Sequence, residues 1–213
     1  MARGTVKARR VIASFALAAS LAACTALNVA THRVSGDPVD APAGTYRADP
    51  RHTSVVFDVD HLGFSRFVAR FNEVEAVLDA VPDAPEKSRL EVTIKAARID
   101  TNVPDLDKML TADDMFDAAR HLDMTFVSKS IVRTGKGTGE VTGDLTMAGR
   151  THPAMLAVTF NGAAPDPLTG EDKLGFSAEG TLDRSDWGLG KWWPAVGNDV
   201  HFRIEAEFAK PKG

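Results

Sequence analysis

The sequence predicts an all-β domain whose antiparallel strands close into a barrel. From residue 45 onward, apolar and polar residues alternate with period two, as strands with one buried face do. Only residues 103–122 depart from this alternation, so a single helical insert interrupts the strands. The apolar positions change parity near Asn72-Glu73, which indicates a β-bulge of the kind that bends strands in barrels. A two-sheet sandwich is the alternative, but the bulge and the inward aromatic residues favour the barrel.

The first strand of the domain indicates which of its faces is buried. Asp58 and Asp60 share one face, and their carboxylates should meet water. Phe57, Val59 and His61 occupy the other face and are therefore expected to point inward.

The later strands show the same pattern of one apolar face each. Glycine-containing segments at 135–139 and 147–150 are expected to form hairpin turns between them. The apolar sets are Phe67, Ala69 and Phe71; Val74, Ala76 and Leu78; Leu90, Val92 and Ile94; Met124 and Phe126; Val141, Gly143, Leu145 and Met147; Leu156, Val158 and Phe160; Leu174, Phe176, Ala178, Gly180 and Leu182; and Val200, Phe202, Ile204, Ala206 and Phe208.

The insert at 103–122 carries apolar residues at helical spacing among acidic residues. We expect one or two short helices there, divided near Thr111. The apolar positions are Leu106, Met109, Leu110, Met115 and Phe116.

The N-terminus has the pattern of an export signal. Four basic residues precede an uncharged run from Val11 to Ala23, and Leu21-Ala22-Ala23-Cys24 resembles a bacterial lipobox. We therefore expect residues 1–23 to be a signal peptide and Cys24, the only cysteine, to carry the lipid that anchors the protein on the periplasmic side of the cell envelope. An ordinary cleaved signal, giving a soluble periplasmic or secreted protein, and an uncleaved anchor over residues 11–30 are the alternatives.

Composition divides the rest of the chain into a linker and one domain. Residues 25–44 are rich in Ala, Pro, Gly, Asp and Thr without an apolar period and are expected to be a flexible tether, and residues 45–210 form the barrel domain. Removal of residues 1–23 takes away four positive charges, leaving 21 basic against 29 acidic residues, a net charge of −8. This balance disfavours nucleic acid and anionic lipid headgroups as partners.

No pattern of residues in the sequence predicts catalysis or metal binding. The chain has no G-x-S-x-G elbow, phosphate loop or H-E-x-x-H sequence, and its histidines show no close ligand spacing. We therefore assign no catalytic residue, no metal ligand and no cofactor.

Four blocks of residues, in order, resemble the YceI-like proteins. This family is described as lipid- or polyisoprenoid-binding, with a lipocalin-like, eight-stranded antiparallel barrel, and the resemblance implies that fold and an apolar ligand here. The blocks are Tyr46, Asp49, His52–Ser54, Phe57, Val59, His61–Gly63, Ser65 and Phe71; Ile99–Asn102, Asp107, Leu110, Asp114, Phe116, Phe126 and Ser128; Gly143–Gly149, Thr151, Pro153 and Leu156; and Gly175, Phe176, Ala178, Arg184, Asp186–Gly188, Val196, Gly197 and Val200.

Twelve residues are expected to contact the lipid. His61 would bond a polar head of the ligand or, alternatively, be a core histidine with a structural partner. The tryptophans between the last two strands would cap the barrel mouth or, alternatively, plug the core. The predicted ligand-binding residues are Phe57, Val59, His61, Phe67, Leu110, Phe116, Phe126, Leu145, Met147, Phe176, Trp187 and Trp193.

Three classes of function are consistent with this pattern. The first is a lipid-anchored binding protein that holds an isoprenoid, quinone or similar long apolar molecule non-covalently. The second is an enzyme acting on a lipid with His61 as acid or base, which would need a second inward titratable group that the sequence does not reveal. The third is a partner module of a membrane redox complex, docking through the helix and the tryptophan loop. The sequence leaves open whether the barrel forms a homodimer.

Overall fold

Strands make up most of the computed structural model, which describes residues 27–211. The strands are β1 (Gly44–His61), β2 (Ser65–Phe71), β3 (Val74–Ala80), β4 (Arg89–Lys95), β5 (Ile99–Asp100), β6 (Asp123–Arg133), β7 (Thr138–Met147), β8 (Arg150–Pro165), β9 (Asp172–Asp183) and β10 (Val196–Ala209). Besides the helical residues 27–31, the helical elements are the 3₁₀ turns η1 (Pro38–Asp40), η2 (Pro85–Lys87) and η3 (Ala96–Arg98), and the α-helix α2 (Pro104–Thr111).

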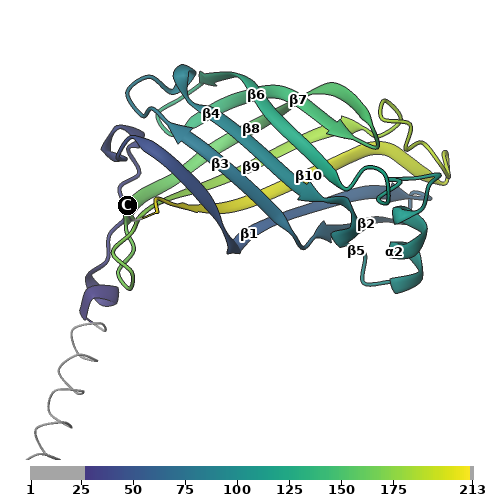
Figure 1. Cartoon of the computed structure of the whole chain (residues 1–213), viewed down its shortest axis with the longest axis horizontal. Coiled ribbons are helices and arrows are strands. Elements are labelled where there is room, and N and C mark those ends of the chain that lie inside the picture. Colours follow the sequence, from purple (N-terminus) through teal and green to yellow (C-terminus); the bar gives the residue numbers. More distant parts are fainter. Residues whose placement is uncertain (1–26, 212–213) are drawn as a thin grey trace, which may run out of the picture.

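The sheet closes into a barrel because β1 pairs with β10 as well as with β2 and β3 (Figure 1). All of these pairings are antiparallel, and the remaining strands follow one another around the wall. β2 and β3 are two halves of one long strand: β3 pairs with residues 44–47 of β1, and β2 with residues 55–61. With β5 only two residues long, the wall is the eight-stranded antiparallel barrel that the sequence and its resemblance predict.

The parity change near residue 72 is a break between two strands, where the sequence predicted a bulge. The backbone N–H of Asn72 donates to the carbonyl of Arg98 over 2.9 Å, and the carbonyl of Glu73 accepts from Lys95 over 3.1 Å. The register shift lies opposite, in β1 between residues 48 and 53, where the strand passes through a proline. The wall therefore bends where β1 changes partner from β3 to β2.

The insert contains the helix that the sequence predicts. α2 begins at Pro104, a residue whose fixed φ suits the first helical position, and ends at Thr111. Residues 112–122 continue as turns and loop. The expected turn at 147–150 is also present: Ala148 and Gly149 have φ values of 47° and 71°, which fit a two-residue hairpin with both central residues left-handed.

The described residues before the barrel, 27–43, include short helical segments and contacts with the wall. Residues 27–31 are helical, Ser35 pairs with Ala163 of β8, and η1 is capped by the Asp37 side chain. Ala41 is buried and packs beside Tyr46. The predicted signal peptide and Cys24 lie outside the described residues. Within the described part of the chain, no helix is long and apolar enough to cross a membrane.

Tyr46 anchors the end of the barrel where the N-terminal segment packs. Its side chain is fully buried, in a cluster with Leu174 and Phe208. Its hydroxyl donates to the carbonyl of Pro42 over 2.7 Å. Burial, aided by the charge of Asp172, raises the pKa of Tyr46 to about 12.

We expect the titration of Tyr46 to report directly on folding of this end. Because Tyr46 is the only tyrosine, ultraviolet absorbance of tyrosinate measures this group alone. In the folded protein, the absorbance should rise with an apparent pKa of about 12. In denaturant it should rise near pH ~10. The folded state favours the protonated phenol of Tyr46. The contribution of this phenol to the free energy of unfolding is therefore complete below pH ~10 and is lost as the pH rises towards the folded-state pKa. A folded-state titration near pH ~10 would show that Tyr46 is exposed.

Candidate functional site

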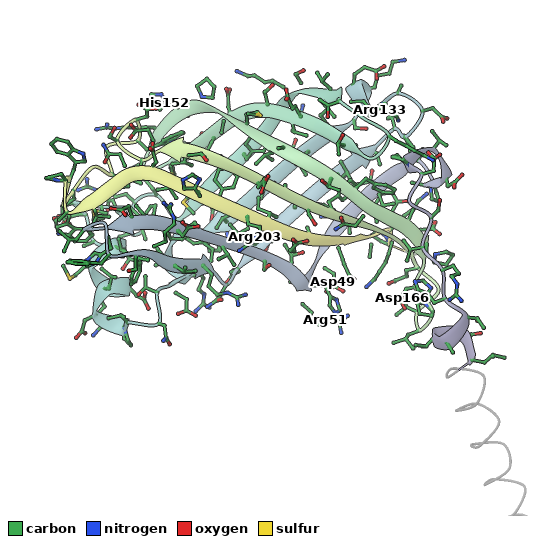
Figure 2. All side chains as sticks on the ribbon, turned by 180° about the vertical axis from the view of Figure 1, so that it is seen from behind. Asp49, Arg51, Arg133, His152, Asp166 and Arg203 are labelled. Carbon is green, nitrogen blue, oxygen red and sulfur yellow. The ribbon has the colours of Figure 1, made fainter. Side chains whose placement is uncertain are left out.

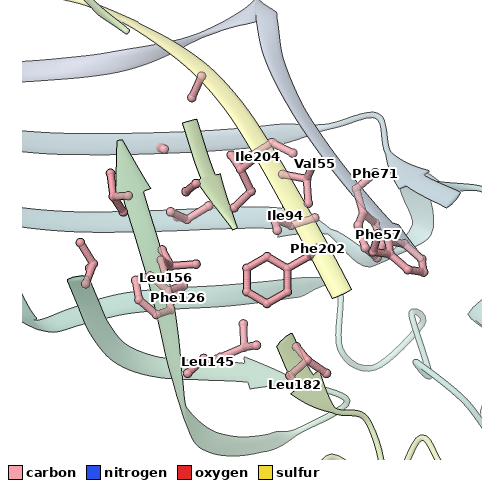
Figure 3. A pocket seen from close by; sticks show the side chains of 18 of the residues that line it. Val55, Phe57, Phe71, Ile94, Phe126, Leu145, Leu156, Leu182, Phe202 and Ile204 are labelled. Carbon is pink, nitrogen blue, oxygen red and sulfur yellow. The ribbon is translucent and has the colours of Figure 1, made fainter. Parts of the chain in front are cut away.

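A cavity of about 770 Å³ lies inside the barrel. This volume falls within the roughly 300–1,000 Å³ that is usual for ligand pockets. Its lining is almost entirely apolar and comes from every long strand and from the insert. Figure 3 shows aliphatic and aromatic side chains from opposite walls, such as Val55 and Leu145, pointing into the same space.

Aromatic rings are grouped in two regions of the cavity. Phe57 and Phe71 stack, with ring centroids 5.4 Å apart, on the pair β1–β2. Phe176 of β9 contacts Phe160 edge-on at 5.4 Å and Phe208 at 5.8 Å. Such contacts hold the rings in fixed orientations, so they form walls with a defined shape.

Two glycines on the barrel wall make room for inward rings. A Cβ at Gly143 would lie 2.7 Å from the ring of Phe126, and one at Gly180 would lie 2.4 Å from the ring of Phe202. Both positions would also clash with a backbone carbonyl oxygen, of Val127 and Met155 respectively. The absence of side chains at these two positions therefore makes room for a large ring from the neighbouring strand.

The structure brings ten of the twelve predicted site residues to one cavity. Whether they contact a lipid stays a prediction, but they share this lining although they come from six elements and from the loop after α2. They are Phe57, Val59, His61, Phe67, Leu110, Phe116, Phe126, Leu145, Met147 and Phe176. The other apolar residues of the insert, Leu106, Met109 and Met115, join them.

The two predicted tryptophans do not line the cavity. Trp187 is buried, its indole N–H donates to the carbonyl of Leu145 over 3.0 Å, and its ring meets His152 edge-on. It therefore plugs one end of the core, which was the alternative interpretation. Trp193 is 66% exposed, while its neighbour Trp192 does line the cavity. Aromatic composition alone could not separate these three roles.

His61 differs from the prediction in depth. It shares the inward face with Phe57 and Val59, as the alternation predicts. It is nevertheless the last residue of β1 and is exposed, so it lies at the rim of the cavity. The imidazole is therefore not a buried core group, and a contact with a ligand there would be open to water.

Arg184 is a charged group at the cavity that sequence reasoning missed. Its side chain lines the cavity and is only 8% exposed. The guanidinium donates to three carbonyls: that of Leu189 in the loop after β9, and those of Val196 at 2.9 Å and Gly197 at 2.8 Å at the start of β10. Burial lowers the pKa of Arg184, but the ordinary value is so high that the group stays charged. The only feature of the sequence that pointed to Arg184 was its place in the last block of the family resemblance, two residues before Asp186.

A second missed group lies on the bend of β1, outside the cavity lining (Figure 2). Asp49, His52 and Glu207 bring their ligand-type atoms within 4.8 Å of one another. The ammonium of Lys173 already lies among these groups, 2.9 Å from Glu207 and 3.5 Å from Asp49. Burial opposes ionisation of Asp49, but hydrogen bonds from His52 and Arg51 hold its pKa well below the usual range. We interpret the cluster as an ion-pair network that fixes the bend.

Comparisons with known proteins agree on the family. The model of the YceI-like domain family matches residues 46–208. A Pseudomonas putida protein named UPF0312 protein is 35% identical over 174 residues, which cover 81% of this chain and 90% of that protein. The solved Campylobacter jejuni YCEI protein is 32% identical, with a TM-score of 0.63 over 72% of this chain and 90% of that chain. A polyisoprenoid binding domain from Saccharophagus degradans shares the fold at 10% identity, with a TM-score of 0.60 over 80% and 100% of the two chains.

The packing predicts that Trp187 stabilises the fold more than Trp193. Trp187→Phe removes a buried hydrogen bond and leaves a void, so the free energy of unfolding should fall by about 1 kcal/mol or more in urea titrations. The matched change Trp193→Phe, at an exposed ring, should stay within about 0.5 kcal/mol of the wild type. Equal effects of the two substitutions would contradict the assignment of Trp187 as a plug.

Proposed function

The chain belongs to the YceI-like family, and we propose that it is a carrier that holds an isoprenoid, quinone or similarly long apolar lipid in its barrel. The observation that carries this proposal is the 770 Å³ cavity with its apolar lining. Eight-stranded barrels either fill their interior with side chains or keep room for one small ligand, and this one keeps room. The polyisoprenoid binding domain with the same fold is consistent with that use of the barrel.

The hydrophobic effect is sufficient to retain such a ligand. Each buried CH₂ contributes about 0.8 kcal/mol, and only the surplus over the cost of ordering ligand and pocket appears as affinity. A chain of several isoprene units therefore binds without a strong polar contact. The phenylalanine groups in the two regions of the cavity offer aromatic contact to such a chain.

The lining favours binding over catalysis. Among the described residues that line the cavity, the ionisable side chains are His61, Arg133, Lys136 and Arg184, and none is a carboxylate. An acid and base pair needs a second group within hydrogen-bond reach of the reacting atoms. His61 at the exposed rim has no inward carboxylate to orient it, so we infer that the cargo leaves unchanged.

We also propose that the protein is exported and anchored through a lipid on Cys24. The basic residues, the uncharged run and Leu21-Ala22-Ala23-Cys24 support this proposal. A lipid anchor would keep the barrel near a membrane, where its apolar cargo resides.

A charge inside the cavity should abolish lipid retention. Phe176→Glu places a carboxylate without a partner among apolar side chains, which is costly for an apolar ligand. After purification and organic extraction, mass spectrometry should recover lipid from the wild type and none from this variant. Near-ultraviolet circular dichroism should confirm that the variant is folded, because water can enter the emptied cavity.

The matched control is Met155→Glu on the neighbouring strand β8. Met155 is 48% exposed on the outer wall, so the same charge there should leave retention unchanged. If the wild type yields no lipid, or both variants retain it equally, the carrier proposal is wrong. If Phe176→Glu and Phe57→Glu both unfold the protein, the interior is a solid core.

The anchor makes a separate prediction. Intact mass should show loss of residues 1–23 and a diacylglycerol-sized gain on Cys24. Cys24→Ser should release the protein from the membrane fraction. An unmodified mature N-terminus at another residue would overturn the proposed anchor, but it would leave the proposed carrier function unaffected.

A further inference from the structure

Large apolar side chains are exposed at the end of the barrel that carries α2 (Figure 1). Phe64, in the β1–β2 turn, is 88% exposed, and Leu62 beside it is 55% exposed. The backbone N–H of Leu62 donates to the carbonyl of Ala195 over 2.8 Å, so this turn adjoins the loop of Trp193. We call Leu62, Phe64, Met109 and Trp193 the mouth patch.

The mouth patch is continuous with the cavity. Met109 belongs to both, being 48% exposed and part of the lining. His61 and Trp192, the immediate neighbours of Leu62 and Trp193, line the cavity as well. An apolar surface therefore runs from the inside of the barrel to its outer rim. Scattered exposed apolar residues need no explanation, but a group of them at the opening of an apolar cavity does.

We propose that the mouth patch docks onto a lipid bilayer, so that cargo passes between membrane and cavity without crossing water. The inference rests on the proposed carrier function, because a long apolar cargo is found in bilayers. Aromatic side chains such as Trp193 suit the boundary between headgroups and acyl chains. A bilayer thus fits this surface better than a second copy of the chain or a protein partner, neither of which supplies the cargo.

The charges around the patch indicate which lipids it fits. On the elements that carry the patch, Arg66, Lys108 and Lys191 are each paired with an aspartate, namely Asp58, Asp105 and Asp114. Few cations are therefore available for anionic headgroups. We conclude that docking is driven by insertion of apolar side chains into an uncharged or zwitterionic surface.

A fluorophore at the patch tests this docking directly. The full chain carrying Cys24→Ser has no other thiol, so Phe64→Cys can be labelled with nitrobenzoxadiazole at that position alone. Phosphatidylcholine vesicles should shift the emission to the blue and raise its intensity, equally in low and high salt. The control label, at Leu168→Cys, should not respond: Leu168 is 69% exposed in the turn after Asp166, at the other end of the barrel (Figure 2).

A second variant links docking to exchange of cargo. Phe64→Ser should weaken partitioning onto the vesicles by about tenfold or more and slow the delivery of bound lipid to them. The amount of lipid extracted from the purified protein should not change, because Phe64 does not line the cavity. Leu168→Ser should match the wild type in all three measurements.

The outcomes separate docking from carriage. If the emission of the label at position 64 does not change when vesicles are added, docking is overturned. If lipid is still extracted from that protein, the carrier function is not affected by this result. A shift that needs no vesicles and grows with protein concentration would assign the patch to a second copy and overturn docking too, as would binding only to anionic vesicles. If no lipid can be extracted from the protein but the emission of the label at position 64 still shifts with vesicles, docking is supported and the carrier function is overturned.

Discussion

The barrel is closed by the pairing of β1 with β10 along most of the length of both strands. This pairing joins the first and last strands of the wall and turns the apolar faces of the strands toward one interior. β1 can do this only because it changes partner along its length, from β3 to β2, at the bend near residues 48–53. The ion-pair network around Lys173 lies at this bend and joins β1 to β9 and β10. The cavity is thus a consequence of closure combined with a wall whose inward side chains do not fill the space.

Different segments of the chain cover the two ends of the barrel. At one end the N-terminal segment packs against the wall, and Pro38 and Ala41 contribute to the cavity lining. At the other end, α2 and the loop after β9 surround the cavity, with Trp187 buried behind it and exposed apolar side chains at the rim. The polar groups at the α2 end, His61 and Arg184, lie close to water or are bonded to the protein's own carbonyls. The interior of the barrel therefore provides a defined shape and apolar contacts for a ligand, and few polar groups that could react with it.

Period-two alternation was sufficient to predict the strands, their buried faces and most of the cavity lining, because a side chain's face follows from its parity. It could not predict depth, so His61 was placed on the correct face but too far inside. The roles of Trp187 and Trp193 depend on how the loop after β9 folds, as does the capture of three carbonyls by Arg184. The cluster around Asp49 needs β9 and β10 to meet the bend of β1, which no local pattern encodes.

We propose that the space inside the barrel holds an apolar ligand. A crystal structure of the protein purified together with its membrane lipids would test this proposal. We expect continuous, elongated density inside the barrel, running from the rings of Phe57 and Phe71 toward those of Phe160 and Phe176. Side chains closed together across the barrel, with no room between opposite walls, would contradict it.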